Sequence, residues 1–354
     1  MNRKALIVGV TGIIGNNLAH HLLNNGWEVF GIARKPYGIV DGVKHIAADL
    51  HDVSDVRAAL KGVDPTHVFY TSWQRHATEA ENIKVNGLMI RNLLDALRGS
   101  ETVEHVALVT GLKHFLGPFE LYGKGLNTTT PFREIMTRLD IENFYYEQED
   151  ELFAAAEREG FSWTVHRPHT VIGYALGNAM NMGMTLATYA AICKETARPF
   201  MFPGNKSQWE GLTDVTDARL LAEHLEWAAI TTEVRNRPLH VVNGDTFRWS
   251  WMWGRIAQWF DLEPVPFDGN GILLETQMAD GHQVWEDMAR KYKLKESSFD
   301  RMASPWHTDA DLGRRFECLT DMSDTRELGF TGYRTTDKVF FDLFHRLRSE
   351  RIIP

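Results

Sequence analysis

Three glycines near the start of the chain set the strongest limit on its fold. Gly9, Gly12 and Gly15 follow an apolar run, Ala5–Val10, and apolar residues then recur at helical spacing as far as Leu23. Such a run predicts a strand that is buried on both faces, and a tight turn from a strand into a helix needs residues without side chains. The chain is therefore predicted to begin with a β-strand, a glycine turn and an α-helix.

The alternation of strand and helix patterns continues through the first half of the chain. It predicts the order β-α-β-α-β-α-β-α-β, which is typical of βαβ units that build a parallel sheet. We therefore expect an α/β fold with a Rossmann-type, doubly wound parallel sheet. Further strands are expected at 27–33, 45–50, 67–70, 105–109 and 162–166, and further helices at 54–60, 82–97 and 147–159.

Beyond residue 168 the chain is rich in Met, Trp and Phe and loses the regular alternation. We interpret this part as a smaller C-terminal region that caps the sheet and binds substrate, with one strand at 239–243 returning to the sheet. The expected division is 1–170 plus about 212–245 for the dinucleotide-binding domain, and 171–211 and 246–354 for the interwoven cap. A long connection after Gly111, through Gly123, Gly125 and 128–131, is more often functional than not.

The charge balance and the cysteine count exclude several classes of protein. The chain has 38 Lys and Arg against 47 Asp and Glu, which argues against a nucleic-acid binder or a basic membrane-surface protein. Cys193 and Cys318 are its two cysteines, too few for a disulfide framework or a Cys-rich zinc site. We expect a cytoplasmic protein with no secretory signal, no membrane span and no bound metal, since no histidine spacing matches a metal motif.

The glycine turn is the first candidate cofactor site. Backbone N–H groups at a helix N-terminus can bind a pyrophosphate, while the third glycine allows the helix to pack close to the strand. A glycine-rich turn without a ligand is the alternative. The residues expected to contact the dinucleotide here are Gly9, Thr11, Gly12, Ile13, Ile14 and Gly15.

Arg34 and Lys35 indicate which dinucleotide is bound. They lie about 20 residues after the glycine turn, where an acidic residue would bind the free ribose hydroxyl of NAD. Two cations suit a 2′-phosphate instead, so NADPH/NADP+ is predicted; a solvated surface pair is the alternative. Asp49 and Leu50 are expected at the adenine, and further cofactor contacts are Thr71, Ser72, Trp73, Thr110, Pro168 and Val171.

The catalytic pair of the short-chain dehydrogenases is absent in its usual form. That pair is a Tyr with a Lys four residues later, but Glu149 follows Tyr145 and Asp150 follows Tyr146 at that spacing. The residues nevertheless resemble the progesterone 5β-reductase and iridoid synthase-like enone reductases, a divergent branch of the extended short-chain dehydrogenases. The resemblance is carried by 110–120, 143–146, 166–168, 189–194, 202–204, 243–245 and 352–354.

The resemblance implies a catalytic lysine at Lys113 and a catalytic tyrosine at Tyr145, and both residues are also expected to contact the cofactor. It implies an NADPH-dependent reductase that transfers hydride to the β-carbon of an enone, with Tyr145 stabilising the enolate oxygen and Lys113 supporting it. The implied substrate is small and apolar. Candidate substrate contacts are Trp73, Phe119, Tyr146, His169, Met180 and Met184, for each of which ordinary packing is the alternative.

His169 departs from the family pattern, which has a small residue after the His-Arg-Pro segment. The larger ring narrows the pocket, supplies another polar contact or points away from the pocket, and we favour the last of these orientations. Two other functions stay open: a carbonyl reductase or epimerase-like dehydrogenase, and an NADP-sensing binding protein without turnover. The superfamily suggests a homodimer.

Overall fold

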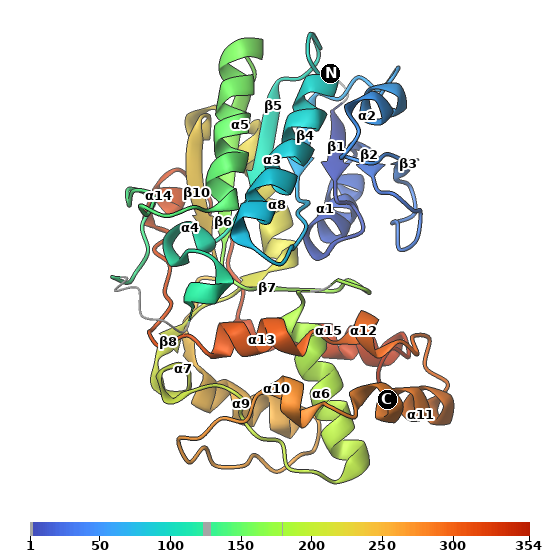
Figure 1. Cartoon of the computed structure of the whole chain (residues 1–354), viewed down its shortest axis with the longest axis vertical. Helices are drawn as coiled ribbons and strands as arrows, with labels where there is room; N and C mark the ends of the chain where they lie inside the picture. Colours follow the sequence, from blue (N-terminus) through green and yellow to red (C-terminus); the bar gives the residue numbers. More distant parts are fainter. Residues whose placement is uncertain (1–2, 123–128, 179) are drawn as a thin grey trace.

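The computed structural model describes residues 3–122, 129–178 and 180–354, so Gly123, Gly125 and Thr128 of the predicted loop lie outside the described residues. Seven parallel strands form the central sheet in the order β10-β6-β5-β4-β1-β2-β3 (Figure 1). The doubly wound parallel sheet is thus confirmed. Its strands are β1 Lys4–Val8, β2 Glu28–Ile32, β3 Lys44–Ile46, β4 His67–Tyr70, β5 His105–Val109, β6 Ser162–Pro168 and β10 Arg237–Val241.

The expected strand near residue 239 is β10, which pairs with β6 through Leu239 and His166. Two details of the prediction are wrong. The residues between β2 and β3, 33–43, contain no helix, so the regular alternation fails at this point. The second helix, α2 (Val53–Ala59), is capped by Asp52 rather than Ser54, because the Asp52 carboxylate accepts hydrogen bonds from the backbone N–H groups of Ser54 and Asp55.

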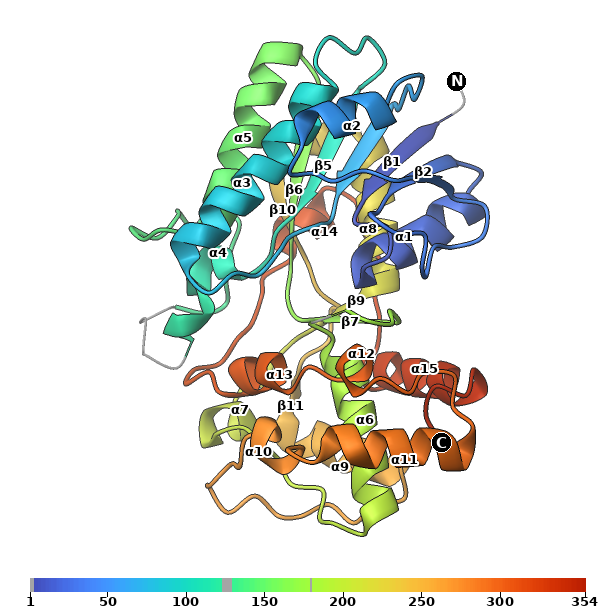
Figure 2. The same cartoon turned by 45° about the vertical axis from the view of Figure 1, so that its right-hand side comes forward.

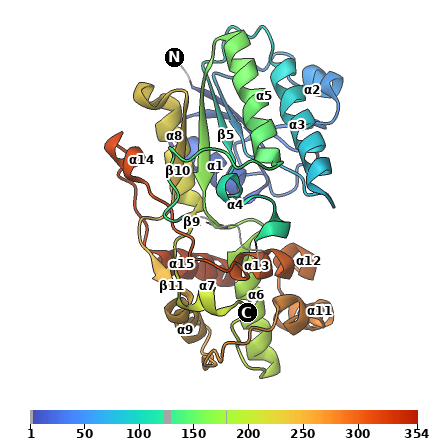
Figure 3. The same ribbon diagram turned by 60° about the vertical axis from the view of Figure 1, so that its left-hand side comes forward.

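Helices cover both faces of the sheet, as Figures 2 and 3 show. On one face α1 packs against α8, and apolar side chains four residues apart, such as Leu18 and Leu22, point into the core they share. On the other face α3 packs against α5 and α2. The helices are α1 Ile13–Asn24, α2 Val53–Ala59, α3 Glu79–Ala96, α5 Phe144–Glu159 and α8 Ala218–Ile230; α4 is Lys113–Leu116 and two short 3₁₀ helices are Phe119–Leu121 and Thr232–Val234.

Most of the later segments form a second layer below the sheet (Figure 1). The Met, Trp and Phe residues of this cap build its own core, around Trp249, Trp253 and Trp285. Its elements are α6 Met182–Thr196, α7 Lys206–Glu210, α9 Trp249–Trp259, α10 Leu274–Gln277, α11 Gly281–Tyr292, α12 Phe299–Met302, α13 Pro305–Leu312 and α15 Thr336–Ser349, with the short strands β7 Val171–Ile172, β8 Leu212–Thr213, β9 Thr216–Asp217 and β11 Phe247–Arg248.

One segment of the expected cap lies with the sheet instead. The helix α14 (Ser323–Glu327) contacts β10, and Met322 and Phe330 share a buried cluster with Leu220 and Val242. We therefore propose the predicted two-part division with two changes. This segment moves to the dinucleotide-binding part, and the strands β8 and β9, which pair with β11 and β7, move to the cap.

The sheet topology points to one place for a ligand. The strand order reverses between β1 and β4, and in open α/β sheets ligands bind beyond the carboxyl ends of the strands at such a point. Val8 and Tyr70 are partners in the register of these two strands. The glycine turn and Thr71 follow them directly, so the fold places both at this edge.

Candidate active site

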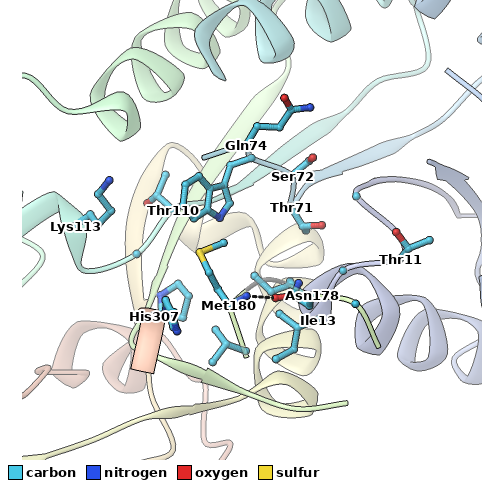
Figure 4. A pocket seen from close by; sticks show the side chains of 18 of the residues that line it. Thr11, Ile13, Thr71, Ser72, Gln74, Thr110, Lys113, Asn178, Met180 and His307 are labelled. Atoms are coloured by element: carbon cyan, nitrogen blue, oxygen red, sulfur yellow. Dashed lines mark hydrogen bonds between the residues drawn. The ribbon is translucent and has the colours of Figure 1, made fainter. Parts of the chain in front are cut away.

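A cavity of about 850 Å³ lies at this edge, between the sheet and the cap (Figure 4). Its walls come from the glycine turn, from the loops after β2, β3, β4, β5 and β6, and from α12 and α13 of the cap. The predicted residues that line it are Gly9, Thr11, Gly12, Ile13, Ile14, Arg34, Lys35, Asp49, Leu50, Thr71, Ser72, Trp73, Thr110, Lys113, Phe119, Tyr145, Pro168, His169, Val171 and Met180.

The glycine turn allows a ligand to approach its backbone closely. Gly9 has φ of +86°, and a Cβ on it would lie 3.1 Å from the Cβ of Ser72. A Cβ on Gly15 would lie 2.3 Å from the carbonyl oxygen of Gly9, so this glycine allows α1 to contact the turn and does not itself line the cavity. Among the residues that the structure describes, no side chain caps α1, so its first N–H groups can receive a pyrophosphate.

The far end of the cavity, near the loop after β2, is rich in cations. Arg34 and Lys35 are exposed there, and Arg301 from α12 joins them across the interface with the cap. The guanidinium of Arg301 lies 4.4 Å from the centre of the Tyr37 ring, and within the described residues its Nη2 is buried with no hydrogen-bond partner. Nε of Arg301 donates to the Glu296 carboxylate at 2.7 Å, so part of its charge is offset, and Nη2 is the donor that the cap leaves available at this end.

Lys113 and Tyr145 come from separate segments and meet in the same cavity. The Nζ atom of Lys113 lies 5.8 Å from the centre of the Tyr145 ring, 4.3 Å from that of Phe144 and 3.6 Å from the Glu79 carboxylate. Burial lowers the pKa of Lys113 to about 8, against the opposing charge of Glu79. Burial also raises the pKa of Tyr145, which keeps its phenol protonated and able to donate.

The helix that carries the tyrosine also holds the loop that carries the lysine. Asn143 donates from Nδ2 to the carbonyl oxygen of Lys113 at 2.7 Å, and Tyr146 donates from its hydroxyl to that of His114 at 2.5 Å. Glu149 lies 3.4 Å from Nδ1 of His114. Position 149, where other short-chain dehydrogenases carry lysine, therefore serves here as an anchor for the loop of Lys113.

Glu149 is buried, and it is charged. Desolvation alone would raise the pKa of its carboxyl, but His114 and Arg167 lower that pKa to about 2. Arg138 forms a further ion pair with it at 3.0 Å. A carboxylate locked in this cluster has no access to the cavity. The missing i+4 lysine is thus explained by an ion cluster between α5, α4 and β6.

Two candidate substrate contacts, Tyr146 and Met184, lie outside the cavity. The hydroxyl of Tyr146 is held by His114 and by the backbone N–H of Leu139, and the residue does not line the cavity. Met184 is 1% exposed and packs in the core of the cap. Neighbouring residues on a helix diverge by about 100°, so only one of the two adjacent tyrosines can face the cofactor.

His169 stays beside the cavity, contrary to the orientation that we favoured. Its Nδ1 lies 2.7 Å from a carboxylate oxygen of Asp214, and its Nε2 lies 2.9 Å from Nη1 of Arg314. The ring is 3% exposed and both of its nitrogens have protein partners. It therefore closes the cavity wall as part of a polar cluster.

Several residues that line or support the cavity carried no recognisable signal in the sequence. They are Glu79, Tyr122, Arg301, His307, Asp311 and Arg314, the last four of which come from the cap and meet the sheet part only in the folded chain. Over the residues that the structure describes, no cluster of three or more His, Cys, Asp or Glu side chains is arranged to hold a metal ion. Within the same residues, no helix is long and apolar enough to cross a membrane.

Comparison with known proteins agrees with this geometry. Residues 5–228 match the model of the NAD dependent epimerase/dehydratase family. Among solved structures, UDP-glucose 4-epimerase from Thermotoga maritima superposes with a TM-score of 0.69 at 14% identity, over 98% of this chain and 99% of that one. An epimerase from Methanothermobacter thermautotrophicus gives a TM-score of 0.72 at 14% identity, over 98% and 93%. These likenesses show the fold.

Curated relatives are closer in sequence. The chain is 38% identical to (S)-8-oxocitronellyl enol synthase of Camptotheca acuminata and to 3-oxo-Delta(4,5)-steroid 5-beta-reductase of Arabidopsis thaliana. Each match covers 99% of this chain and 93% of the relative. The chain therefore belongs to the NAD dependent epimerase/dehydratase family and, within it, to the group of the steroid 5β-reductase and the iridoid-forming enol synthases.

Proposed function

We propose that the protein is an NADPH-dependent reductase of the activated C=C bond of enones. The observation that carries this proposal is the convergence of Lys113, Tyr145 and the glycine turn on one cavity. The names of the relatives agree with it, since one is a 3-oxo-Delta(4,5)-steroid reductase and the other an enol synthase. Retention of both reactive residues argues against a binding protein without turnover.

The residues of the cavity are suited to hold the dinucleotide. The glycine turn would bind the pyrophosphate, Arg34 and Lys35 the 2′-phosphate, and Thr110 and Pro168 the nicotinamide end. Over the described residues the hydroxyl of Thr110 is buried without a partner, as expected of a group that awaits a ligand. When bound, the cofactor supplies a hydride to the β-carbon of the enone.

Tyr145 stabilises the charge that develops on the enone oxygen. As the β-carbon receives hydride, the electron pair of the C=C bond moves toward the carbonyl and the oxygen becomes an enolate. A preorganised phenol donates a hydrogen bond to this oxygen and lowers the barrier. The ammonium of Lys113 adds a positive charge beside the tyrosine, and solvent returns a proton to the α-carbon.

The reaction is tested by isotopic transfer. We expect that 4-deuterated NADPH and a cyclic enone give a saturated ketone with deuterium on the β-carbon, read by NMR and mass spectrometry. An allylic alcohol with deuterium on the carbinol carbon would show carbonyl reduction instead. Tight binding of NADPH with no oxidation over a panel of enones and aldehydes would favour a binding protein.

The Lys113–Glu79 pair predicts the pH dependence. Since the pKa of Lys113 is about 8, the ammonium is lost above that pH and kcat/KM for the enone, at saturating NADPH, falls on the alkaline side. The substitution Glu79→Gln removes an anion that raises this pKa, and the alkaline limb should move to lower pH. Glu81→Gln, on the same helix but paired with the Thr78 cap, is the control. Superimposable profiles for Glu79→Gln and the wild type would refute the pairing.

We also propose that the protein is a homodimer and that it lies in the cytoplasm. The superfamily suggests a homodimer formed through helices that flank the sheet, which light scattering on the purified protein tests. The two cysteines are both buried and unpaired, which suits a reducing compartment such as the cytoplasm.

A further inference from the structure

The wall of the cavity beside α13 is polar, although apolar residues were expected around the substrate. His307 and Asp311 lie on α13, Arg314 follows it, and Tyr122 faces them from the sheet part; all four line the cavity. We call these four residues the polar wall. Their exposed fractions are only 9%, 4%, 3% and 6%, so their polar atoms are removed from bulk water.

The polar wall lies at the substrate end of the cavity. The ring of Phe119 is 4.9 Å from Nζ of Lys113, and its centre is 6.1 Å from that of His307 and 5.1 Å from that of Tyr122. In Figure 4, His307 and Lys113 lie at one end of the pocket and Thr11 of the glycine turn at the other. A molecule held beside Tyr145 and Lys113 therefore meets the polar wall, whereas the phosphates of a dinucleotide do not.

The charges of the polar wall do not favour an anion. Arg314 has one carboxylate, Asp311, at 3.6 Å, and Nη1 of Arg314 also contacts His169, which in turn contacts Asp214. The pKa of His169 is raised to about 9 against the desolvation of its ring, in part by its hydrogen bond with Asp214. Two carboxylates therefore balance the positive charges of Arg314 and His169, and the cluster carries no net positive charge. A substrate carboxylate or phosphate would gain little attraction and would lose its hydration, so a neutral group fits better.

The hydrogen-bonding groups of the polar wall are not all used. In the described structure, Nδ1 of His307 and Nε of Arg314 are buried without a partner, and Oδ1 of Asp311 lies beyond hydrogen-bond distance of Arg314. Oδ2 of Asp311 accepts from Thr170 at 2.6 Å. A wholly hydrocarbon substrate would leave these groups unpaired, at about 1–3 kcal/mol each.

A hydroxyl group matches this set better than a carbonyl. The wall offers a donor in the guanidinium of Arg314 and an acceptor in the carboxylate of Asp311, and a hydroxyl both donates and accepts, whereas a carbonyl only accepts. We propose that the substrate is an enone that also carries a neutral hydroxyl group, received by His307, Asp311 and Arg314 of the polar wall. This inference rests on the proposed function and names the substrate class of that site.

The test compares hydroxylated cyclic enones with their deoxy parents. The hydroxy enones carry the hydroxyl group at each ring carbon outside the enone system in turn. For each hydroxy enone and its deoxy parent, kcat/KM is measured. We expect at least one hydroxy enone to exceed its parent by about tenfold or more, as for sites built to bind a substrate hydroxyl. His307→Phe and Asp311→Asn should each reduce this ratio, His307→Phe partly by raising kcat/KM for the deoxy parent.

A matched control separates this effect from a general change in the cap. His282, an exposed histidine of α11 outside the cavity, is replaced by Phe in the control variant, which should keep the wild-type ratio. Thermal midpoints of all variants, measured with NADPH present, show whether each one is folded. If His307→Phe does not fold, His307→Gln takes its place. This substitution keeps a polar group and should retain part of the preference for the hydroxy enone.

Each contrary result has a defined meaning. Equal rates for every hydroxy enone and its parent, or a preference that His307→Phe and Asp311→Asn leave intact, would overturn the inference while C=C reduction stands. A ketone or carboxylate analogue that outperforms the hydroxy enone would overturn the choice of a hydroxyl. Failure to reduce the C=C bond of any enone would instead refute the proposed function itself.

Discussion

Replacing Tyr145 by Phe is expected to lower kcat for enone reduction about 100-fold, because the loss of one preorganised donor to a developing oxyanion costs about 10²–10³ in rate. The phenol lies within the cavity, and a Cβ on Gly111 would lie 3.4 Å from its oxygen. The ring itself is retained in the Phe variant, so the cavity keeps its shape. The measurement is single-turnover oxidation of NADPH in the presence of saturating enone.

Tyr146 offers a matched control on the same helix. Its hydroxyl is bonded to His114 and Leu139, outside the cavity. Tyr146→Phe should therefore lower the thermal midpoint, since it leaves buried partners unsatisfied at about 1–3 kcal/mol, but reduce the rate far less than Tyr145→Phe. If the two variants lost activity equally, or if Tyr145→Phe kept the wild-type rate, Tyr145 would not be the donor.

The double variant Arg34→Ala/Lys35→Ala is expected to weaken NADPH binding about 100-fold and leave NADH binding almost unchanged. Each charge-assisted contact with the 2′-phosphate contributes about 1.5 kcal/mol, and NADH lacks this group. Both side chains line the cavity at its exposed end. Dissociation constants for the two cofactors, from the quenching of protein fluorescence, give the ratio directly.

The control for this prediction removes the same total charge elsewhere. Arg57 and Lys61 are exposed cations on and after α2, outside the cavity that holds the glycine turn. Arg57→Ala/Lys61→Ala should leave the preference for NADPH intact. Equal loss of affinity for NADPH and NADH in the Arg34/Lys35 variant would mean that these cations act on the dinucleotide as a whole, and the 2′-phosphate assignment would be wrong.

Much of the sheet was predictable because buried parallel strands and amphipathic helices leave local patterns. The strands at 67–70 and 105–109 have the predicted bounds, and the glycine turn lies where the first strand ends. A helix was wrongly predicted between β2 and β3. The prediction assumed that the strict alternation of βαβ units continues there, but this connection is a loop. The cap contains many short helices. The positions of their apolar residues depend on tertiary contacts, so the sequence of the cap shows no clear helical or strand periodicity.

For the candidate site too, part could be predicted from the sequence and part could not. The sequence alone predicted the glycine turn and the cations after the second strand, since each lies in a short motif whose chemistry is readable, whereas Lys113 and Tyr145 were implied by the family resemblance. Only the tertiary structure placed Tyr145 in the cavity and Tyr146 outside it, gave Glu149 its role as an anchor, and brought Arg301 and the polar wall of α13 to the cavity. These contacts join segments far apart in the chain, and the direction of a side chain on a helix depends on how that helix packs.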